Sequence, residues 1–322
     1  MTSFRAARKL TKLFFATDVH GSEICWKKFI SAGKFYEADV LILGGDMTGK
    51  AIVPIIENGH GTFRSVLLEQ ESILHGEDEV KEMEKRIRSR GYYPYRTTRE
   101  EVAEFEKKPD LINPIFIKLV LKTAEEWLDY ACEKLKGTGI RCFIAPGNDD
   151  MFELDDLVKS CKQVEHCEGR VVQIDDHHEM ISSGWTNPTP WHTFRESTEE
   201  DLADRLTAMT AQVNNMQNCI FNLHVPPYNS GLDEAPELTK DLRPKLAGNL
   251  LTPVGSKAVR ETFEKHQPLL GLHGHIHECK ATTRIGRTLC INPGSMYEQG
   301  FLSGALVVLE KNKIKSFVLT NG

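Results

Sequence analysis

The first fifty residues carry two continuous hydrophobic runs with an amphipathic segment between them. The runs lie within residues 12–18 and 38–46, and polar residues or glycines end each of them. Runs of this length predict buried β-strands, and the apolar spacing within residues 22–38 predicts a helix. A strand, a helix and a second buried strand begin an α/β fold.

The alternation stops at about residue 50 and resumes only at about residue 115. This segment is highly charged and shows no strong strand pattern, whereas residues 76–90 are typical of an exposed helix. A second helix is expected to begin at Thr98, which forms a capping box with Glu101. We therefore predict one domain over residues 1–322 with a charged helical insertion, or cap, at 50–115.

Strand patterns return after a helix predicted at about 115–136. The apolar run before the sequence APGNDD, residues 145–150, predicts another strand, and the end of the chain resembles a β-hairpin that turns at 311–313. Further strands are predicted at about 171–174, 179–184, 217–223, 269–273, 280–285 and 288–292. This order of elements is typical of a large α/β domain.

Composition narrows the class of protein. Of the 322 residues, 40% are hydrophobic, which is enough for a large core, and the formal net charge is −6. This acidic balance argues against binding of nucleic acid through its phosphate backbone. The eight cysteines are scattered without CxxC pairs, which favours buried, reduced thiols. No apolar stretch suits a membrane span or a secretory signal, so we expect a cytoplasmic protein.

Five short polar motifs stand at or beside the ends of predicted strands. Open α/β sheets place their sites at the carboxyl ends of their strands. Three histidines spaced two apart would repel one another when protonated, and a metal ion would keep them neutral. The motifs are Asp18-Val19-His20, Gly44-Gly45-Asp46, Gly147-Asn148-Asp149-Asp150, His224 ahead of Pro226-Pro227, and His273, His275 and His277 in GLHGHIHE.

The donor atoms in these motifs indicate the kind of ion. Two aspartates, one asparagine and at least four histidines offer oxygen and nitrogen without a thiolate. Such a set suits Mn²⁺ or iron, with Zn²⁺ as an alternative, rather than Ca²⁺. Seven side chains exceed the need of one ion and suit two divalent or trivalent ions that share a bridging carboxylate. Two ions about 3.5–4 Å apart are the known arrangement for displacement at phosphorus.

In this order, the motifs D-x-H, G-G-D, G-N-x-D, H before P-P, and G-H-x-H resemble those of the calcineurin-like metallophosphoesterase superfamily. They span residues 18–295, and INPGS at 291–295 is similar to a strand-end motif of several smaller members. The resemblance implies an α/β fold, a four-layer αββα sandwich of two mixed β-sheets flanked by helices. The chain lacks the GDxVDRG form of the Ser/Thr protein phosphatases, which argues against that branch.

The resemblance also implies a role for each matching residue. Two metal ions would be bridged by Asp46. The first ion would be held by Asp18, His20 and His277, and the second by Asn148, His224 and His275. His273 matches no family role and is expected to be structural.

One position departs from the family pattern. Most members carry G-N-H-D or G-N-H-E, whose histidine contacts the phosphate and assists the leaving group, whereas this chain has Asp149 there. An aspartate beside two cations stays ionised, so it has no proton to donate and it repels phosphate. Loss of a general acid typically slows a reaction by about 10²–10⁴-fold. We expect metal-bound water, or His60 or His75 of the insertion, to protonate the leaving group instead.

The predicted function is that of a metal-dependent phosphoric ester hydrolase, with a phosphodiesterase favoured. A metal-bridging hydroxide would attack phosphorus, with Asp46, Asn148, Asp149 and His224 at the catalytic centre. A diester carries one charge fewer than a monoester, so Asp149 repels it less. A phosphomonoesterase or nucleotidase, and a catalytically weak metal-binding scaffold, stay open as alternatives. The expected partner is a small phosphate ester. Nucleic acid is less favoured, no membrane is involved, and the oligomeric state is left open.

The insertion also holds a cluster of aromatic rings with one cation. The cluster consists of Tyr92, Tyr93, Tyr95 and Arg96. Such a set could stack a base and hold a phosphate. Packing of the rings onto the sandwich is the alternative that we favour.

Overall fold

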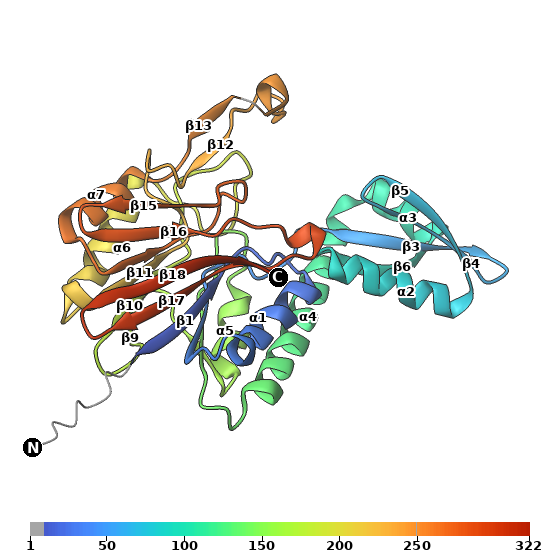
Figure 1. Ribbon diagram of the computed structural model, residues 1–322. Coiled ribbons are helices and arrows are strands. Elements are labelled where there is room, and N and C mark those ends of the chain that lie inside the picture. Colours follow the sequence, from blue (N-terminus) through green and yellow to red (C-terminus); the bar gives the residue numbers. More distant parts are fainter. Residues whose placement is uncertain (1–9, 249) are drawn as a thin grey trace, which may run out of the picture.

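The computed structural model describes residues 10–248 and 250–322, so residues 1–9 of the expected domain lie outside the described residues. Two six-stranded mixed sheets form its centre (Figure 1). The first has the order β18-β17-β1-β2-β7-β8, formed by Lys313–Asn321, Ser303–Glu310, Thr11–Ala16, Val40–Leu43, Arg141–Ile144 and Val164–His166. The second has the order β15-β16-β14-β11-β10-β9, formed by Ala281–Ile285, Thr288–Asn292, Leu270–Leu272, Cys219–Leu223, Glu179–Ser183 and Val171–Gln173.

Side chains of the central strands alternate between two cores. Leu13 and Phe15 of β1 belong to the core between the sheets, together with Ile220 of β11 and Leu272 of β14. Phe14, between them in sequence, belongs to a second core that it shares with helices. This period of two is the geometry of a β-strand, and burial on both faces explains the continuous apolar runs.

Helices cover both outer faces and complete four layers. Those on the first sheet are α1 (Glu23–Phe35), α4 (Ile112–Leu135) and α5 (Glu153–Ser160). Those on the second sheet are α6 (Glu199–Thr210) and α7 (Lys257–His266). Short elements lie in the connections. They are β12 (Glu234–Pro236) paired with β13 (Leu251–Pro253), and 3-10 turns at Pro109–Leu111, Met216–Asn218, Lys245–Gly248 and Tyr297–Gln299. The predicted αββα sandwich is confirmed.

Parallel pairing decides where the loops meet. β1, β2 and β7 run parallel in the first sheet. β10, β11, β14 and β16 run parallel in the second. Because the carboxyl ends of parallel strands lie at the same edge, the loops that follow them gather there.

The insertion is not simply helical, which corrects the sequence prediction. It contains a four-stranded sheet of order β5-β4-β3-β6, formed by Gln70–His75, Thr62–Leu67, Ile52–Gly59 and Tyr93–Thr98. The two expected helices are present as α2 (Gly76–Ser89) and α3 (Arg99–Lys107), and the Thr98 side chain accepts a hydrogen bond from Glu101 N. Figure 1 shows this insertion extending away from the sandwich.

The sequence pattern does not predict the strands of the insertion because each of them mixes apolar residues with charged or polar ones. Val53 and Ile55 of β3 pack with Val80 of α2 in a small separate core. The strands also carry charged residues, and Arg64 and Glu71 form an exposed ion pair. In strands of ten or fewer residues, the charged positions obscure the hydrophobic period of two. The sheet is therefore recognised only from the pairing of its strands.

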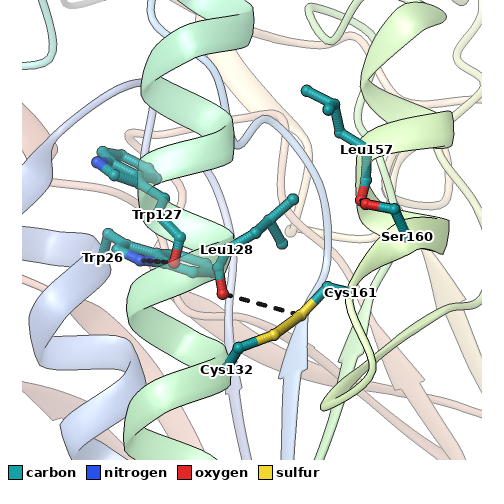
Figure 2. The surroundings of a disulfide bond; sticks show 7 residues. All are labelled: Trp26, Trp127, Leu128, Cys132, Leu157, Ser160 and Cys161. Carbon is teal, nitrogen blue, oxygen red and sulfur yellow. Dashed lines mark hydrogen bonds between the residues drawn. A yellow bond between two sulfur atoms is a disulfide. The ribbon is translucent and has the colours of Figure 1, made fainter.

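The cysteines provide a second correction. Cys132 of α4 and Cys161, which caps the end of α5, form a disulfide with 6.7 Å between their Cα atoms (Figure 2). The carbonyl oxygen of Leu128, one turn before Cys132, lies 3.8 Å from the Cys161 sulfur, and Trp26 stacks on the neighbouring Trp127. The six other cysteines are free and buried, as expected. The spacing of 29 residues gives no sign that the two helices lie side by side.

None of the helices in residues 10–248 and 250–322 combines the length and apolar character needed to cross a membrane.

Candidate metal centre

The loops after β1 and β2 are joined through their backbones. Asp18 N donates to Gly45 O at 3.0 Å, and His20 N donates to Asp46 O at 2.9 Å. Asp18, His20 and Asp46 have φ angles of 53°, 37° and 51°. The left-handed region costs a residue with a side chain about 1–2 kcal/mol, and such strain concentrates at functional sites. The chain therefore holds these three side chains in position against a conformational cost.

Close approach of the loops requires glycine at two further positions. A Cβ at Gly147 would lie 2.1 Å from Asp46 Oδ1, and a Cβ at Gly274 would lie 2.3 Å from Asp18 Oδ2. Neither contact is compatible with any larger residue. The glycines of the third and fifth motifs thus allow the loops to close around the two carboxylates.

The predicted ligands form two groups of converging donor atoms. Within each group, the donor atoms lie within 4.8 Å of one another. One group consists of Asp18, His20 and His277, and the other of Asp46, His224 and His275. All of them are buried except His277 and His275, which are partly exposed.

Asp46 belongs to the second group and also contacts the first. Its Oδ2 is 3.5 Å from His20 Nε2 in the first group and 3.3 Å from His224 Nε2 in the second. His20 Nε2 and His277 Nε2 approach to 2.9 Å, and His277 Nε2 is 3.3 Å from Asp18 Oδ1. Ring nitrogens this close to one another and to carboxylates suit a common cation.

Other hydrogen bonds fix which donor atoms face the centre. His224 Nδ1 lies 3.1 Å from Gly44 O, which leaves its buried Nε2 without a hydrogen-bond partner. Asn148 Nδ2 donates to Thr193 Oγ1 at 2.9 Å, which leaves its buried Oδ1 unpartnered. A buried polar atom without a partner costs about 1–3 kcal/mol, and a cation would satisfy both of these. The donors present therefore fit a pair of metal ions.

Two hydrogen bonds hold Asp18 in position, one from the fifth motif and one from INPGS. His275 N donates to Asp18 Oδ2 at 3.1 Å, and Ser295 Oγ donates to the Asp18 carbonyl at 2.6 Å. His273 pairs through Nδ1 with Leu223 O at 2.7 Å and packs against the ring of Phe263 at a tilt of 60°, outside both donor groups. These contacts are what a structural role for His273 predicts.

The charges of the centre are strongly coupled in the protein without metal. Burial lowers the pKa of His224, but the carboxylates of Asp46 and Asp18 outweigh burial and raise this pKa to about 10. Burial lowers the pKa of His20 to about 3 and that of His275 to about 4. A metal ion would displace the proton of His224, so metal binding should release protons.

Asp149 is held at the same centre, and Lys50 pairs with it. Asp149 N donates to Asp46 Oδ1 at 2.9 Å, and Asp149 Oδ2 lies 2.6 Å from Lys50 Nζ. Burial, followed by the charge of Asp46, raises the pKa of Asp149 to about 6. Burial lowers the pKa of Lys50, but the carboxylates of Asp149, Asp46 and Asp18 together outweigh burial and raise this pKa above its usual value. The lysine therefore stays charged beside the centre.

Sequence reasoning missed Lys50, although it stands only four residues after Asp46 in GGDMTGK. It also gave no role to Asp150, whose buried carboxylate accepts hydrogen bonds from Gly147 N, Met47 N and Thr48 N. Asp150 thereby ties the second motif to the third.

The two histidines proposed as acids lie far from the centre, which corrects that prediction. His60 follows β3 at the end remote from Lys50, and His75 pairs with Thr62 beside it. The eight residues of β3 span roughly 25 Å at about 3.3 Å per residue. Figure 1 shows the β3–β4 turn at the outer end of the insertion. Neither exposed ring can serve as the leaving-group acid in this conformation.

The aromatic cluster of the insertion is occupied by internal contacts. Arg96 binds Glu77 and Glu84 of α2, and Tyr93 accepts a hydrogen bond from Gly49 N. Tyr92 and Tyr95 donate to Glu298 and Glu101 respectively. These contacts are those of packing and favour the structural alternative.

Comparison of the sequence with known proteins matches part of the chain. No protein-family model matches the chain. The uncharacterised protein MJ1162 of Methanocaldococcus jannaschii is 32% identical over 150 residues, 46% of this chain, and the match spans 61% of that relative's length.

Solved structures are similar in fold at low identity. TT1561 of Thermus thermophilus is 13% identical with a TM-score of 0.52, covering 98% of this chain and 99% of that one. An archaeal phosphodiesterase is 12% identical with a TM-score of 0.37, and the match covers 96% of this chain and 100% of that one. The two mixed sheets and the flanking helices are therefore the fold that this chain shares with TT1561.

Proposed function

We propose that the chain is a two-metal phosphoesterase, with phosphodiesters as the favoured substrates. The observation that carries this proposal is the position of Asp46, within 3.5 Å of a histidine from each of two buried donor groups. Two adjacent donor groups that share one carboxylate suit a pair of ions, and a single ion would leave half of the donors unused.

Each predicted ligand then has a defined task. Asp18, His20 and His277 would hold one ion, Asn148, His224 and His275 the other, and Asp46 both. Mn²⁺ or iron fits this oxygen and nitrogen set, with Zn²⁺ as the alternative. When bound, such a pair supplies a nucleophile from water at neutral pH and neutralises phosphoryl oxygens. Asn148 is oriented for this task by Thr193, which turns its Oδ1 away from other partners.

Lys50 offers what the missing histidine would supply. Its ammonium offsets the charge of Asp149, so a phosphate anion does not face an uncompensated carboxylate. Lysine has three N–H donors, and the half-exposed side chain of Lys50 leaves donors free beyond the one that Asp149 accepts. A phosphoryl oxygen at the centre would therefore meet a fixed cation. Diesters stay the favoured substrates because Lys50 reduces the repulsion from Asp149 without removing its carboxylate from the centre, and a diester carries one charge fewer than a monoester.

The test is Mn²⁺-dependent hydrolysis of bis-p-nitrophenyl phosphate beside p-nitrophenyl phosphate. Nitrophenolate leaves without a proton, so a missing acid cannot hide activity. Asp46→Asn is the matched blank, because it removes the shared carboxylate with little change of shape. We expect diester turnover in the wild type, two Mn²⁺ per chain, and loss of both in the variant.

Other outcomes would point elsewhere. Faster turnover of the monoester would favour a phosphomonoesterase or nucleotidase. Two bound ions with no turnover of either ester would favour the metal-binding scaffold and refute the enzyme.

A further inference from the structure

A mostly apolar pocket of about 770 Å³ lies between the sheet of the insertion and the helices beside it. β3 and β6 form one wall, through Ile52, Pro54 and Tyr95. Phe105 of α3 and Ile112 at the start of α4 form the other. Ligand sites commonly enclose about 300–1,000 Å³, so the space suits an organic group rather than a single ion.

The pocket uses the face of the insertion sheet that its small core leaves free. Pro54 of β3 pairs with Tyr95 of β6, and paired residues of neighbouring strands share a face. Val53 and Ile55 point to the opposite face, where they pack against α2. The insertion sheet thus has one filled face and one face that borders a pocket.

Lys50 connects this pocket to the candidate metal centre. The same side chain that lines the pocket places its Nζ 2.6 Å from Asp149 Oδ2. A ligand whose anionic group lies against Lys50 could therefore extend directly along Ile52 and Pro54. The Lys50 ammonium and the apolar walls are therefore separated by no more than the length of the Lys50 side chain.

Two of the hydroxyl groups in the walls are engaged by Glu101, which lies outside the pocket lining. Thr97 and Tyr95 both donate to Glu101, at 2.5 and 2.9 Å. Their hydroxyl protons are therefore not free to recognise a base or a sugar. Recognition in this pocket is expected to depend on burial of apolar surface.

We propose that this pocket binds the apolar organic group, alkyl or aryl, of a phosphate ester whose phosphoryl group lies at the Asp and His cluster beside Lys50. This inference rests on the proposed function for the position of the phosphoryl group. It names the substrate class as phosphate esters with one apolar group.

Binding of alkylphosphonates tests the pocket without turnover, because their P–C bond is not hydrolysed by displacement at an ester. Methyl-, butyl- and hexylphosphonate are titrated into the Mn²⁺-loaded full chain by calorimetry. Each methylene that becomes buried should tighten binding by about fourfold. Burial of three methylenes therefore predicts hexylphosphonate binding about 60-fold tighter than methylphosphonate.

Two neighbouring residues give a matched pair of variants. Ile112 lines the pocket and is 38% exposed, whereas Leu111 is 40% exposed and lies outside the lining. Ile112→Glu should abolish the increase in affinity with alkyl chain length and leave methylphosphonate binding unchanged. Leu111→Glu should keep this increase in affinity. Phe105→Ser provides a second pocket variant should Ile112→Glu fail to fold.

The outcomes separate the pocket from the proposed function. Equal affinity for methyl- and hexylphosphonate, or a gain that survives in both pocket variants, overturns the pocket even if diesters are hydrolysed. A gain that the pocket variants remove supports the pocket even if no ester is hydrolysed, and then only the hydrolase proposal fails. Absence of any phosphonate binding overturns the pocket as a substrate site.

Discussion

Lys50 Nζ and Asp149 Oδ2 lie 2.6 Å apart at the edge of the candidate metal centre. Asp149 occupies the position at which the resembling family carries histidine, and Lys50 begins the insertion. Where the family pattern has a neutral or positive histidine, this chain has the carboxylate of Asp149 paired with the ammonium of Lys50. The pair keeps the local charge close to that of a site without Asp149, and it places an N–H donor where a phosphate would bind.

Removal of the ammonium tests this relationship. Lys50→Met keeps the length of the side chain and exposes phosphate to the full charge of Asp149. A hydrogen bond to a charged group contributes about 1.5–3 kcal/mol, so kcat/KM for bis-p-nitrophenyl phosphate should fall about 10- to 100-fold. Lys27→Met, which removes a half-exposed lysine paired with Glu23 on α1, should change nothing. Unchanged turnover in Lys50→Met at normal metal content would refute the role of Lys50.

Asp149 itself is expected to be dispensable for proton transfer. Asp149→Ala should retain turnover of nitrophenyl diesters within about tenfold, because no general acid is removed. The ratio of rates for p-nitrophenyl and phenyl leaving groups should match that of the wild type. A selective loss of the phenyl ester, which needs a proton more, would show that Asp149 is the acid. Abolished turnover with both ions still bound would also contradict the prediction.

A half-buried carboxylate outside the candidate metal centre makes stability depend on pH. Asp175 accepts hydrogen bonds from Thr11 Oγ1 at 2.5 Å, from His177 N at 2.7 Å and from His178 Nδ1 at 2.7 Å. Burial raises the pKa of Asp175, but these bonds outweigh burial and hold the pKa well below its usual value. A lowered pKa in the folded state stabilises the protein above the unfolded value of about 4, and this contribution is lost as pH falls below it.

Asp175→Asn should therefore lower the free energy of unfolding by about 2 kcal/mol at pH 7, measured by urea unfolding. The difference from the wild type should shrink at pH 3, where the wild-type carboxylate begins to lose its advantage. Asp39→Asn, at an exposed carboxylate that accepts one bond from Lys12 N, is the control. A difference that is the same at both pH values would contradict the prediction.

The disulfide between Cys132 and Cys161 predicts a thiol count. Of eight cysteines, the two that are bonded leave six free thiols, so unfolding without reductant should expose six and unfolding with reductant eight. Closure of a loop of this length is worth about 3–4 kcal/mol in the unfolded-chain model, so reduction should lower the melting temperature. Cys132→Ser should show seven thiols under both conditions and no response to reductant. Eight thiols in unreduced protein that was alkylated on lysis would refute the bond.

The sequence determined the sandwich and the identity of the clustered donors. Period-two and continuous apolar runs specify strands locally, and parallel strands bring their carboxyl ends to one edge whatever the loops contain. Asp18, Asp46 and His224 could therefore be grouped from their positions alone, and the structure places His224 Nε2 within 3.8 Å of both carboxylates.

Only the tertiary structure decided the contacts that depend on how distant segments cross. The insertion sheet rests on β3 pairing in parallel with β6 across an intervening hairpin and helix, and its charged strands carry no local signal. Lys50 meets Asp149, and Cys132 meets Cys161, because separate elements pack together, which no spacing encodes. The same packing carries His60 to the outer end of the insertion, away from the site to which sequence reasoning assigned it. Local periodicity is a property of the chain, whereas these partnerships are properties of the packed fold.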